Sequence, residues 1–155
     1  MLCEIPKKYF FVAGSSEGYS RLNAFDAALI KAGVGNTNLV KVTSIIPPYA
    51  EEVEPIELPP GALVPTAYSV ITSELEGEII SAAVAVAIPE DKSKPGIIME
   101  YSSKGHKEDV ERVVRKMAEE AMKIRGEEKI RIKSISVQHQ VRRIGTAFAA
   151  VILWY

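Results

Sequence analysis

The chain has 155 residues, of which 47% are apolar and 25% charged, and its formal net charge is −1. This length and balance are typical of one globular domain with its own hydrophobic core. A net charge so close to zero excludes a strongly basic nucleic-acid-binding protein and gives no reason to expect an anionic membrane as partner. The apolar run 79–88 has about half the length that spans a bilayer.

The counts of cysteine and histidine argue against disulfides and against zinc sites built from these residues. Cys3 is the only cysteine, and His106 and His139 are the only histidines. The chain therefore has no internal disulfide and lacks the ligands that build most zinc sites. Residues 1–8 lack the apolar centre of a signal peptide. We expect one cytoplasmic domain over residues 1–155, with no metal ion.

In the first half of the chain, apolar runs alternate with turn-forming residues. Residues 9–13 predict a strand, and the Gly- and Ser-rich residues 14–18 predict a turn. A helix running to about residue 31 follows, capped by Ser20 or Asn23, with its apolar side formed by Leu22, Phe25, Leu29 and Ile30. Two glycines then end the helix, and residues 38–43 predict a second strand. Residues 45–65 hold six prolines and predict a stiff loop.

The second half has clearer periodicity. Residues 107–125 predict an amphipathic helix, whose apolar positions are Val110, Val113, Val114, Met117, Ala118, Ala121 and Ile124. Further strands are predicted at 66–72, 79–88, 96–101, 130–137 and 146–155, the last buried on both faces. Two helices and about seven strands predict an α+β layered sandwich in which the helices cover the sheet faces.

Ser44 lies between the predicted strand 38–43 and the rigid pair Pro47 and Pro48. A hydroxyl held at this point can attack the carbonyl carbon of Thr43. That attack would break the chain between Thr43 and Ser44 and convert Ser44 into a pyruvoyl group. The local sequence alone favours the alternative, a capping or turn serine.

Glu100 is a carboxylate inside the otherwise apolar strand 96–101. A carboxyl group that burial deprives of hydration can hold its proton near neutral pH and act as a proton donor. The alternative is a glutamate on the solvent side of an edge strand, which the alternation of side chains permits.

Two further polar residues have both a functional and a structural interpretation. The spacing of Asp26 from Leu22 and Leu29 puts it at the edge of the apolar helix side, where a carboxylate could receive a guanidinium through two hydrogen bonds. A surface aspartate paired with a neighbour is the alternative. Asn38 could donate a hydrogen bond to an oxyanion, or could be a turn residue after Gly35.

Seven short stretches of the chain follow one another in an order that is specific to one family. They are VAGSSEG at 12–18, LNAFDAAL at 22–29, AGVGN at 32–36, SIIPP at 44–48, PPGALVPTAY at 59–68, IMEY at 98–101 and FAA at 148–150. Each is weakly specific alone, whereas the ordered set is highly specific. On these stretches the chain resembles the pyruvoyl-dependent arginine decarboxylases along almost its whole length.

The resemblance implies that the chain is a self-processing precursor. The Ser44 hydroxyl would attack the Thr43 carbonyl, the amide would become an ester, and β-elimination with hydrolysis would leave a pyruvoyl group derived from Ser44. The products would be a β chain of residues 1–43 and an α chain of residues 44–155. The enzyme would then need neither pyridoxal phosphate nor a metal ion.

The resemblance also implies a reaction, an assembly and residue roles. L-Arginine would form a Schiff base with the pyruvoyl group and yield agmatine, a polyamine precursor, and CO2. The fold would be a four-layer αββα sandwich, assembled as a homotrimer with active sites at the subunit interfaces. Asn38 would assist self-cleavage, Glu100 would be the proton donor, and Asp26 would recognise the guanidinium. Leu29 and Gly35 would complete the substrate-binding site.

Thr43 departs from the family pattern, in which a serine precedes the cleavage point. Only the Thr43 carbonyl takes part, so processing should survive, whereas attack by Thr43 on Val42 would give a ketobutyryl group instead. Two other functions remain open: a pyruvoyl-dependent decarboxylase of another amino acid, and a non-processing, inactive homologue that acts as an assembly partner.

Overall fold

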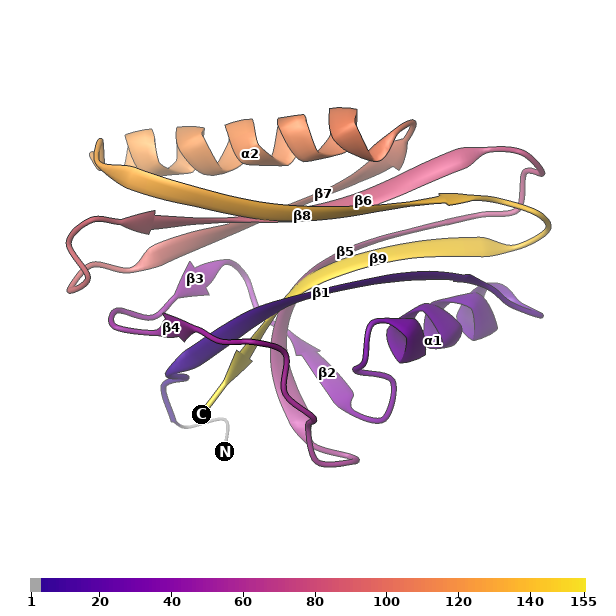
Figure 1. The fold of residues 1–155 in the computed structure, drawn as a ribbon, viewed down its shortest axis with the longest axis horizontal. Helices are drawn as coiled ribbons and strands as arrows, with labels where there is room; N and C mark the ends of the chain where they lie inside the picture. Colours follow the sequence, from indigo (N-terminus) through magenta and orange to yellow (C-terminus); the bar gives the residue numbers. More distant parts are fainter. Residues whose placement is uncertain (1–3) are drawn as a thin grey trace.

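The computed structural model of the chain describes residues 4–155, so Cys3 lies outside the described residues. It forms four layers, in which two β-sheets stack face to face and one helix covers the outer face of each (Figure 1). The elements in chain order are β1 (Lys8–Glu17), α1 (Arg21–Lys31), β2 (Asn38–Lys41), β3 (Ile45–Ile46), β4 (Glu51–Glu52), β5 (Leu63–Ser73), β6 (Ile79–Pro89), β7 (Gly96–Lys104), α2 (Lys107–Ile124), β8 (Ile130–Gln140) and β9 (Gly145–Trp154).

The two sheets have different topologies. The five-stranded sheet has the order β2-β5-β9-β1-β4, in which β2 pairs with β5 and β4 pairs with β1 in parallel. The four-stranded sheet has the order β3-β7-β6-β8 and is antiparallel throughout. The short strands β2 and β3 follow one another in the chain, yet each lies at an edge of a different sheet.

Three apolar layers hold these elements together. One lies between the sheets, one beneath α1 and one beneath α2. Strand β9 contributes to two of them, because Ala149 and Val151 face the other sheet while Phe148 and Ile152 face α1. Alternate side chains of a strand point to opposite faces, so a strand with an apolar layer on each side must be apolar throughout. The prediction for residues 146–155 is confirmed.

Local sequence signals account for both helices. The hydroxyl of Ser20 accepts a hydrogen bond of 3.1 Å from the backbone N–H of Asn23 and so caps α1. Helix α2 places Val110, Val114 and Ala118 against the four-stranded sheet and its charged side chains in solvent. The predicted αββα sandwich with a helix on each outer face is therefore confirmed.

Three local predictions are wrong. Residues 14–17 form no turn, because β1 pairs with β9 as far as Glu17. The second strand ends at Lys41 rather than at residue 43, because the chain then crosses to the other sheet. The stretch 45–65 is not loop throughout: it contains β3 and β4, and β5 already begins at Leu63.

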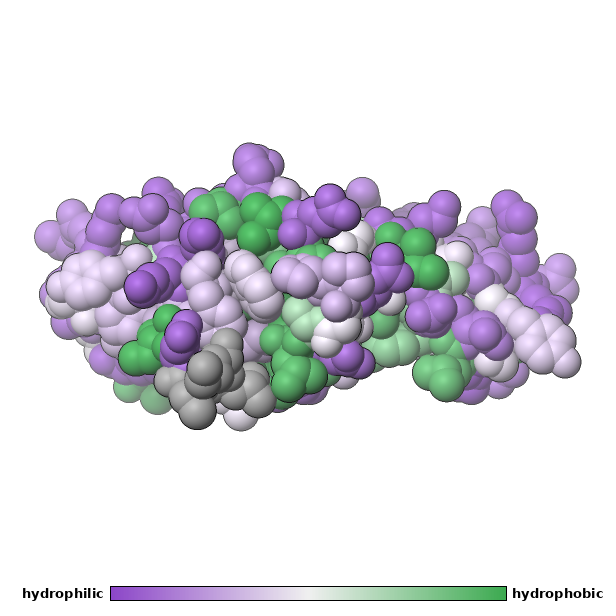
Figure 2. Space-filling model, turned by 90° about the horizontal axis from the view of Figure 1, so that it is seen from below, coloured by the Kyte–Doolittle hydropathy of each residue, from purple (hydrophilic) through white to green (hydrophobic). Residues whose placement is uncertain are grey.

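The apolar side of α1 is narrower than its sequence suggests. Leu22 and Ile30 are 74% and 60% exposed, whereas Ala24, Ala28 and Leu29 face the sheet. Figure 2 looks at the molecule from the α1 side and shows apolar surface scattered between hydrophilic side chains. Within residues 4–155, no helix combines the length and the apolar character needed to cross a membrane.

Candidate active site

The bond between Thr43 and Ser44 lies where the backbone crosses from one sheet to the other. The N–H of Val42 donates to the carbonyl of Thr66 in the five-stranded sheet (3.0 Å). The carbonyl of Ser44 accepts from the N–H of Ile98 in the four-stranded sheet (2.7 Å). One residue, Thr43, therefore separates two backbone groups that are fixed in different sheets.

The backbone after Ser44 is held closely. Strand β3 pairs with β7, and its Ile46 stands opposite Gly96. A side chain on Gly96 would lie 2.9 Å from the Ala87 carbonyl oxygen and 3.1 Å from Ile46 Cβ, so only glycine lets β3 approach this far. Tyr49 then has a φ of 64°, a left-handed conformation that is uncommon for a bulky residue. The pair Pro47 and Pro48 therefore follows directly on a strand that is fixed to β7.

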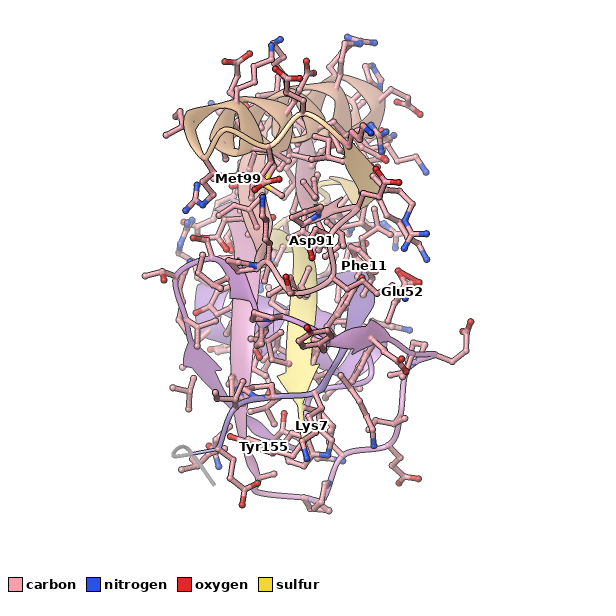
Figure 3. The ribbon with its side chains drawn as sticks, turned by 90° about the vertical axis from the view of Figure 1, so that its left-hand side faces the viewer. Lys7, Phe11, Glu52, Asp91, Met99 and Tyr155 are labelled. Carbon is pink, nitrogen blue, oxygen red and sulfur yellow. The ribbon has the colours of Figure 1, made fainter. Side chains whose placement is uncertain are left out.

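Glu100 lies on β7 two residues beyond Ile98, the residue that binds the Ser44 carbonyl. Its side chain therefore points to the same face as Ile98, toward the other sheet. Met99, between them, points to the opposite face and lies beneath α2 (Figure 3). The Glu100 side chain is 29% exposed, which is intermediate between the buried and the solvent-facing positions that the sequence left open.

The two carboxylate oxygens of Glu100 have different surroundings. Oε1 lies 3.0 Å from Nζ of Lys41, the last residue of β2. Oε2 is buried and has no hydrogen-bond partner within the described residues. A buried oxygen without a partner is costly and usually signals a role or a missing ligand. Oε2 is therefore the carboxylate oxygen of Glu100 that still lacks a hydrogen-bond partner.

The other predicted site residues lie elsewhere in the chain. Asn38 starts β2 and donates from Nδ2 to the Gly61 carbonyl (3.1 Å). It precedes Ser44 by six positions, which corresponds to up to about 20 Å in extended chain. Asp26 is exposed on α1, outside the five-stranded sheet, and Leu29 is buried beneath the same helix. Gly35 packs closely on Ile30 at the end of α1.

The structure therefore separates the predicted residues into two groups. Ser44 and Glu100 lie at the crossover between the sheets. Asp26, Leu29, Gly35 and Asn38 belong to α1 and to the segment that leads into β2. Residues 4–155 contain no cluster of three or more His, Cys, Asp or Glu side chains that could hold a metal ion.

Lys41 contacts Glu100 at the crossover, and the sequence analysis did not select it. Its Nζ contacts Glu100, donates to the carbonyl of Tyr68 (3.1 Å) and lies 4.5 Å from the centre of the Tyr68 ring. The available signal was a single cation in the otherwise apolar run 39–42, the same kind of signal that singled out Glu100.

Comparisons with known proteins identify the family of this chain. The family model described as pyruvoyl-dependent arginine decarboxylase matches residues 8–155. A pyruvoyl-dependent arginine decarboxylase of Methanocaldococcus jannaschii is 55% identical over 152 residues, which cover 98% of this chain and 92% of that protein. A relative of the same name from Methanococcus aeolicus is 50% identical over 97% of this chain and 91% of its own length. One from Pyrococcus abyssi is 43% identical over 96% of both.

The fold is an αββα sandwich, and the matches define the class of protein as a decarboxylase that uses a pyruvoyl group. Within that class, the chain belongs to the pyruvoyl-dependent arginine decarboxylase family.

Proposed function

We propose that the chain cleaves itself between Thr43 and Ser44 and that the processed form converts L-arginine to agmatine and CO2. The observation that carries the proposal is the crossover at Ser44 beside Glu100, whose buried Oε2 lacks a partner. The matched family supplies the reaction class. The residues present fit a pyruvoyl group at position 44, because the backbone on both sides is fixed and a carboxyl group lies on the strand that holds Ser44.

Self-cleavage needs only groups of this chain and water. The Ser44 hydroxyl adds to the Thr43 carbonyl carbon, and the Thr43–Ser44 amide becomes an ester as the Ser44 nitrogen takes up the hydroxyl proton. β-Elimination then leaves a carboxylate on Thr43 and a double bond between Cα and Cβ of residue 44. Water releases the nitrogen as ammonia and leaves a ketone. Thr43 contributes only its carbonyl, so the threonine at this position is compatible with the reaction.

The cofactor is the pyruvoyl group, with no pyridoxal phosphate and no metal ion. Once formed, this group supplies a ketone that binds the α-amine of arginine as a Schiff base and accepts the electrons released as CO2 leaves. Glu100 provides the proton for the α-carbon, through the carboxyl group that faces the crossover. The product, agmatine, places the enzyme in polyamine synthesis.

We infer that more than one copy of the chain contributes to a complete site. Asp26 is exposed on α1, which covers the outer face of the five-stranded sheet, whereas Ser44 and Glu100 lie at the crossover between the sheets. A homotrimer with the site at each subunit interface would join Ser44 and Glu100 of one copy to Asp26, Leu29, Gly35 and Asn38 of its neighbour.

Two other functions compete with this one. A decarboxylase of another amino acid would use the same Ser44 and Glu100 with a different neighbour in place of the guanidinium. An inert homologue that only assembles with an active chain would remain uncleaved. The names of the relatives favour arginine for this family, and the hydroxyl of Ser44 at the crossover favours processing.

The decisive assay is release of labelled CO2 from carboxyl-labelled arginine by the purified protein. We expect labelled CO2 and an equal amount of agmatine, and no release from Ser44→Ala, which should run as one uncleaved band. Thr43→Ala is the matched control, and it should still cleave, because only the carbonyl of residue 43 takes part. Release from lysine or ornithine at a rate equal to that from arginine would favour the first competing function, and an uncleaved native chain would favour the second.

A further inference from the structure

The ammonium group of Lys41 makes three contacts at the crossover between the sheets. Nζ lies 3.0 Å from Oε1 of Glu100, donates to the Tyr68 carbonyl at 3.1 Å and faces the Tyr68 ring at 4.5 Å. A lysine side chain that is free in solvent samples many rotamers, whereas three partners from two strands select one position for Nζ. The ammonium is therefore a fixed point against which the Glu100 carboxylate is oriented.

The contact makes the two oxygens of Glu100 inequivalent. Oε1 is occupied by Lys41, while Oε2 is the one buried side-chain nitrogen or oxygen that has no partner in the described part of the chain. Rotation of the carboxylate would exchange the two oxygens, but it would break the ion pair with Lys41. Lys41 thus keeps Oε2 as the oxygen that has no partner of its own.

This contact also connects the two pieces that self-cleavage would produce. Lys41 belongs to residues 1–43 and lies two residues before the proposed cleavage point, while Glu100 and Tyr68 belong to residues 44–155. The ion pair would therefore hold the new end of the short piece beside the carboxyl group that the reaction uses.

From these observations we infer that Lys41 is a positioning residue for decarboxylation: it fixes Oε1 of Glu100 so that Oε2 takes up a proton from water and delivers it to the α-carbon. The inference rests on the proposed function. Lys41 does not touch the reacting atoms, and its effect is confined to the orientation of Glu100. Its loss should therefore lower kcat and leave arginine binding and self-cleavage nearly intact.

The test compares Lys41→Met, Lys41→Arg and the control Lys123→Met in the self-cleaved protein. Lys123 pairs with Glu120 at 3.1 Å and is 57% exposed, close to the 51% of Lys41, but it lies on α2, on the outer side of the four-stranded sheet. We expect all three to cleave on an SDS gel as the native chain does. Lys41→Met should lose about tenfold or more in kcat with KM changed less than about twofold. Lys41→Arg should regain most of the loss, and Lys123→Met should show none.

Several results would overturn the inference. They are a native kcat in Lys41→Met, a loss confined to KM, or a folded Lys41→Met chain that fails to cleave. Should Lys41→Met not fold, a crystal structure of the processed native enzyme decides: Nζ within about 3.5 Å of Oε1 supports the inference, and a clear separation contradicts it. A native chain that remains one band would instead refute the proposed function itself, and the inference with it.

Discussion

Glu100 shows how much depends on the surroundings of single atoms. One carboxylate oxygen is paired with Lys41, and the other is buried without a partner. Strand alternation directs the Glu100 side chain toward the inter-sheet space. The hydrogen bond from the Ile98 N–H holds Ser44 against β7, the strand that carries Glu100. The residue roles proposed for this protein therefore separate into making the cofactor, which is the task of Ser44, and moving a proton, which is the task of Glu100.

Glu100→Gln tests that separation. The amide keeps the size of the side chain but has no acidic proton, so the variant should cleave itself and decarboxylate poorly, with kcat lower by about 100-fold or more. Cleavage is scored on an SDS gel and turnover by CO2 release. Undiminished turnover would remove Glu100 as the proton donor.

Asp26→Asn tests substrate recognition. Loss of a charge-assisted pair with the guanidinium should weaken arginine binding by about 1–3 kcal/mol, which appears as a higher KM. Asp26 is exposed in the single chain, so the substitution should leave the melting temperature of the protein unchanged. An unchanged KM for arginine would exclude contact between this carboxylate and the substrate.

At the scale of elements, the connection from α1 to β2 holds Gly35, a proposed substrate-binding residue, by close packing. A side chain on Gly35 would lie 2.5 Å from Ile30 Cγ1 and 2.8 Å from Ile30 Cα. Real Cβ atoms do not approach so closely, so either the backbone at Gly35 or the last turn of α1 would have to move.

Gly35→Ala should therefore destabilise the chain by about 1–3 kcal/mol and raise the KM for arginine, because the same movement displaces the proposed substrate-binding backbone at Gly35. Thermal unfolding and steady-state kinetics measure the two effects. Asn36→Ala, at the adjacent exposed position, is the control and should change neither. A Gly35→Ala protein with native stability and native KM would show that this close packing is unimportant.

The elements that the sequence predicted well are those with enough residues to show a period. Helix α2 and strands β6 and β9 have long periodic or apolar runs, and each of their predicted bounds lies within one residue of the observed bound. Strands β3 and β4 have two residues each, so no period exists to detect, and pairing with β7 and β1 alone defines them. The end of β2 at Lys41 was also missed, because the crossover that ends it depends on partners far along the chain.

The site was predictable in part. Ser44 and Glu100 could be selected because each is a polar residue in an unusual local setting. Lys41 could not be assigned a role, because its function depends on a contact between strands of different sheets. The spacing of Asp26 predicted the edge of the apolar helix side, but only the structure shows how exposed that edge is.

At the scale of the whole molecule, the proposed cleavage would not separate the two pieces. Strand β1, in residues 1–43, pairs with β9 from Lys8 opposite Trp154 to Glu17 opposite Gly145. Helix α1 adds its apolar side to the core beneath the same sheet. The processed protein should therefore keep the fold of the uncleaved chain.

Glu17 adds a second connection between the pieces and makes stability depend on pH. Its carboxylate accepts from the backbone N–H groups of Arg143 (2.8 Å), Ile144 (3.2 Å) and Arg142 (3.3 Å), and His139 Nε2 lies 2.5 Å away. Burial alone would raise the pKa of Glu17, but the Arg143 N–H, His139 and the Arg142 N–H outweigh it and lower the pKa from 4.5 to about 2.

Because the folded-state pKa of Glu17 lies below the unfolded value, its stabilisation is complete above about pH 4.5 and is lost as the pH falls toward 2. Glu17→Gln should flatten the fall in unfolding free energy over that window. The contribution is about 1–2 kcal/mol at neutral pH, after allowance for solvent around a side chain that is 29% exposed. Denaturant unfolding at several pH values measures it, with Glu76→Gln as the exposed control. An unchanged pH dependence in Glu17→Gln would contradict this assignment.

The central claim, that Ser44 becomes the cofactor, is tested most directly by intact mass spectrometry of the purified protein before and after borohydride reduction in the presence of arginine. The account predicts two masses, one for residues 1–43 with a free carboxylate and one for residues 44–155 that is lighter by one ammonia than a chain beginning with serine. After reduction, only the second mass should increase, by the amine it has bound. A single mass for residues 1–155, or a second fragment that begins with an intact serine, would contradict the claim.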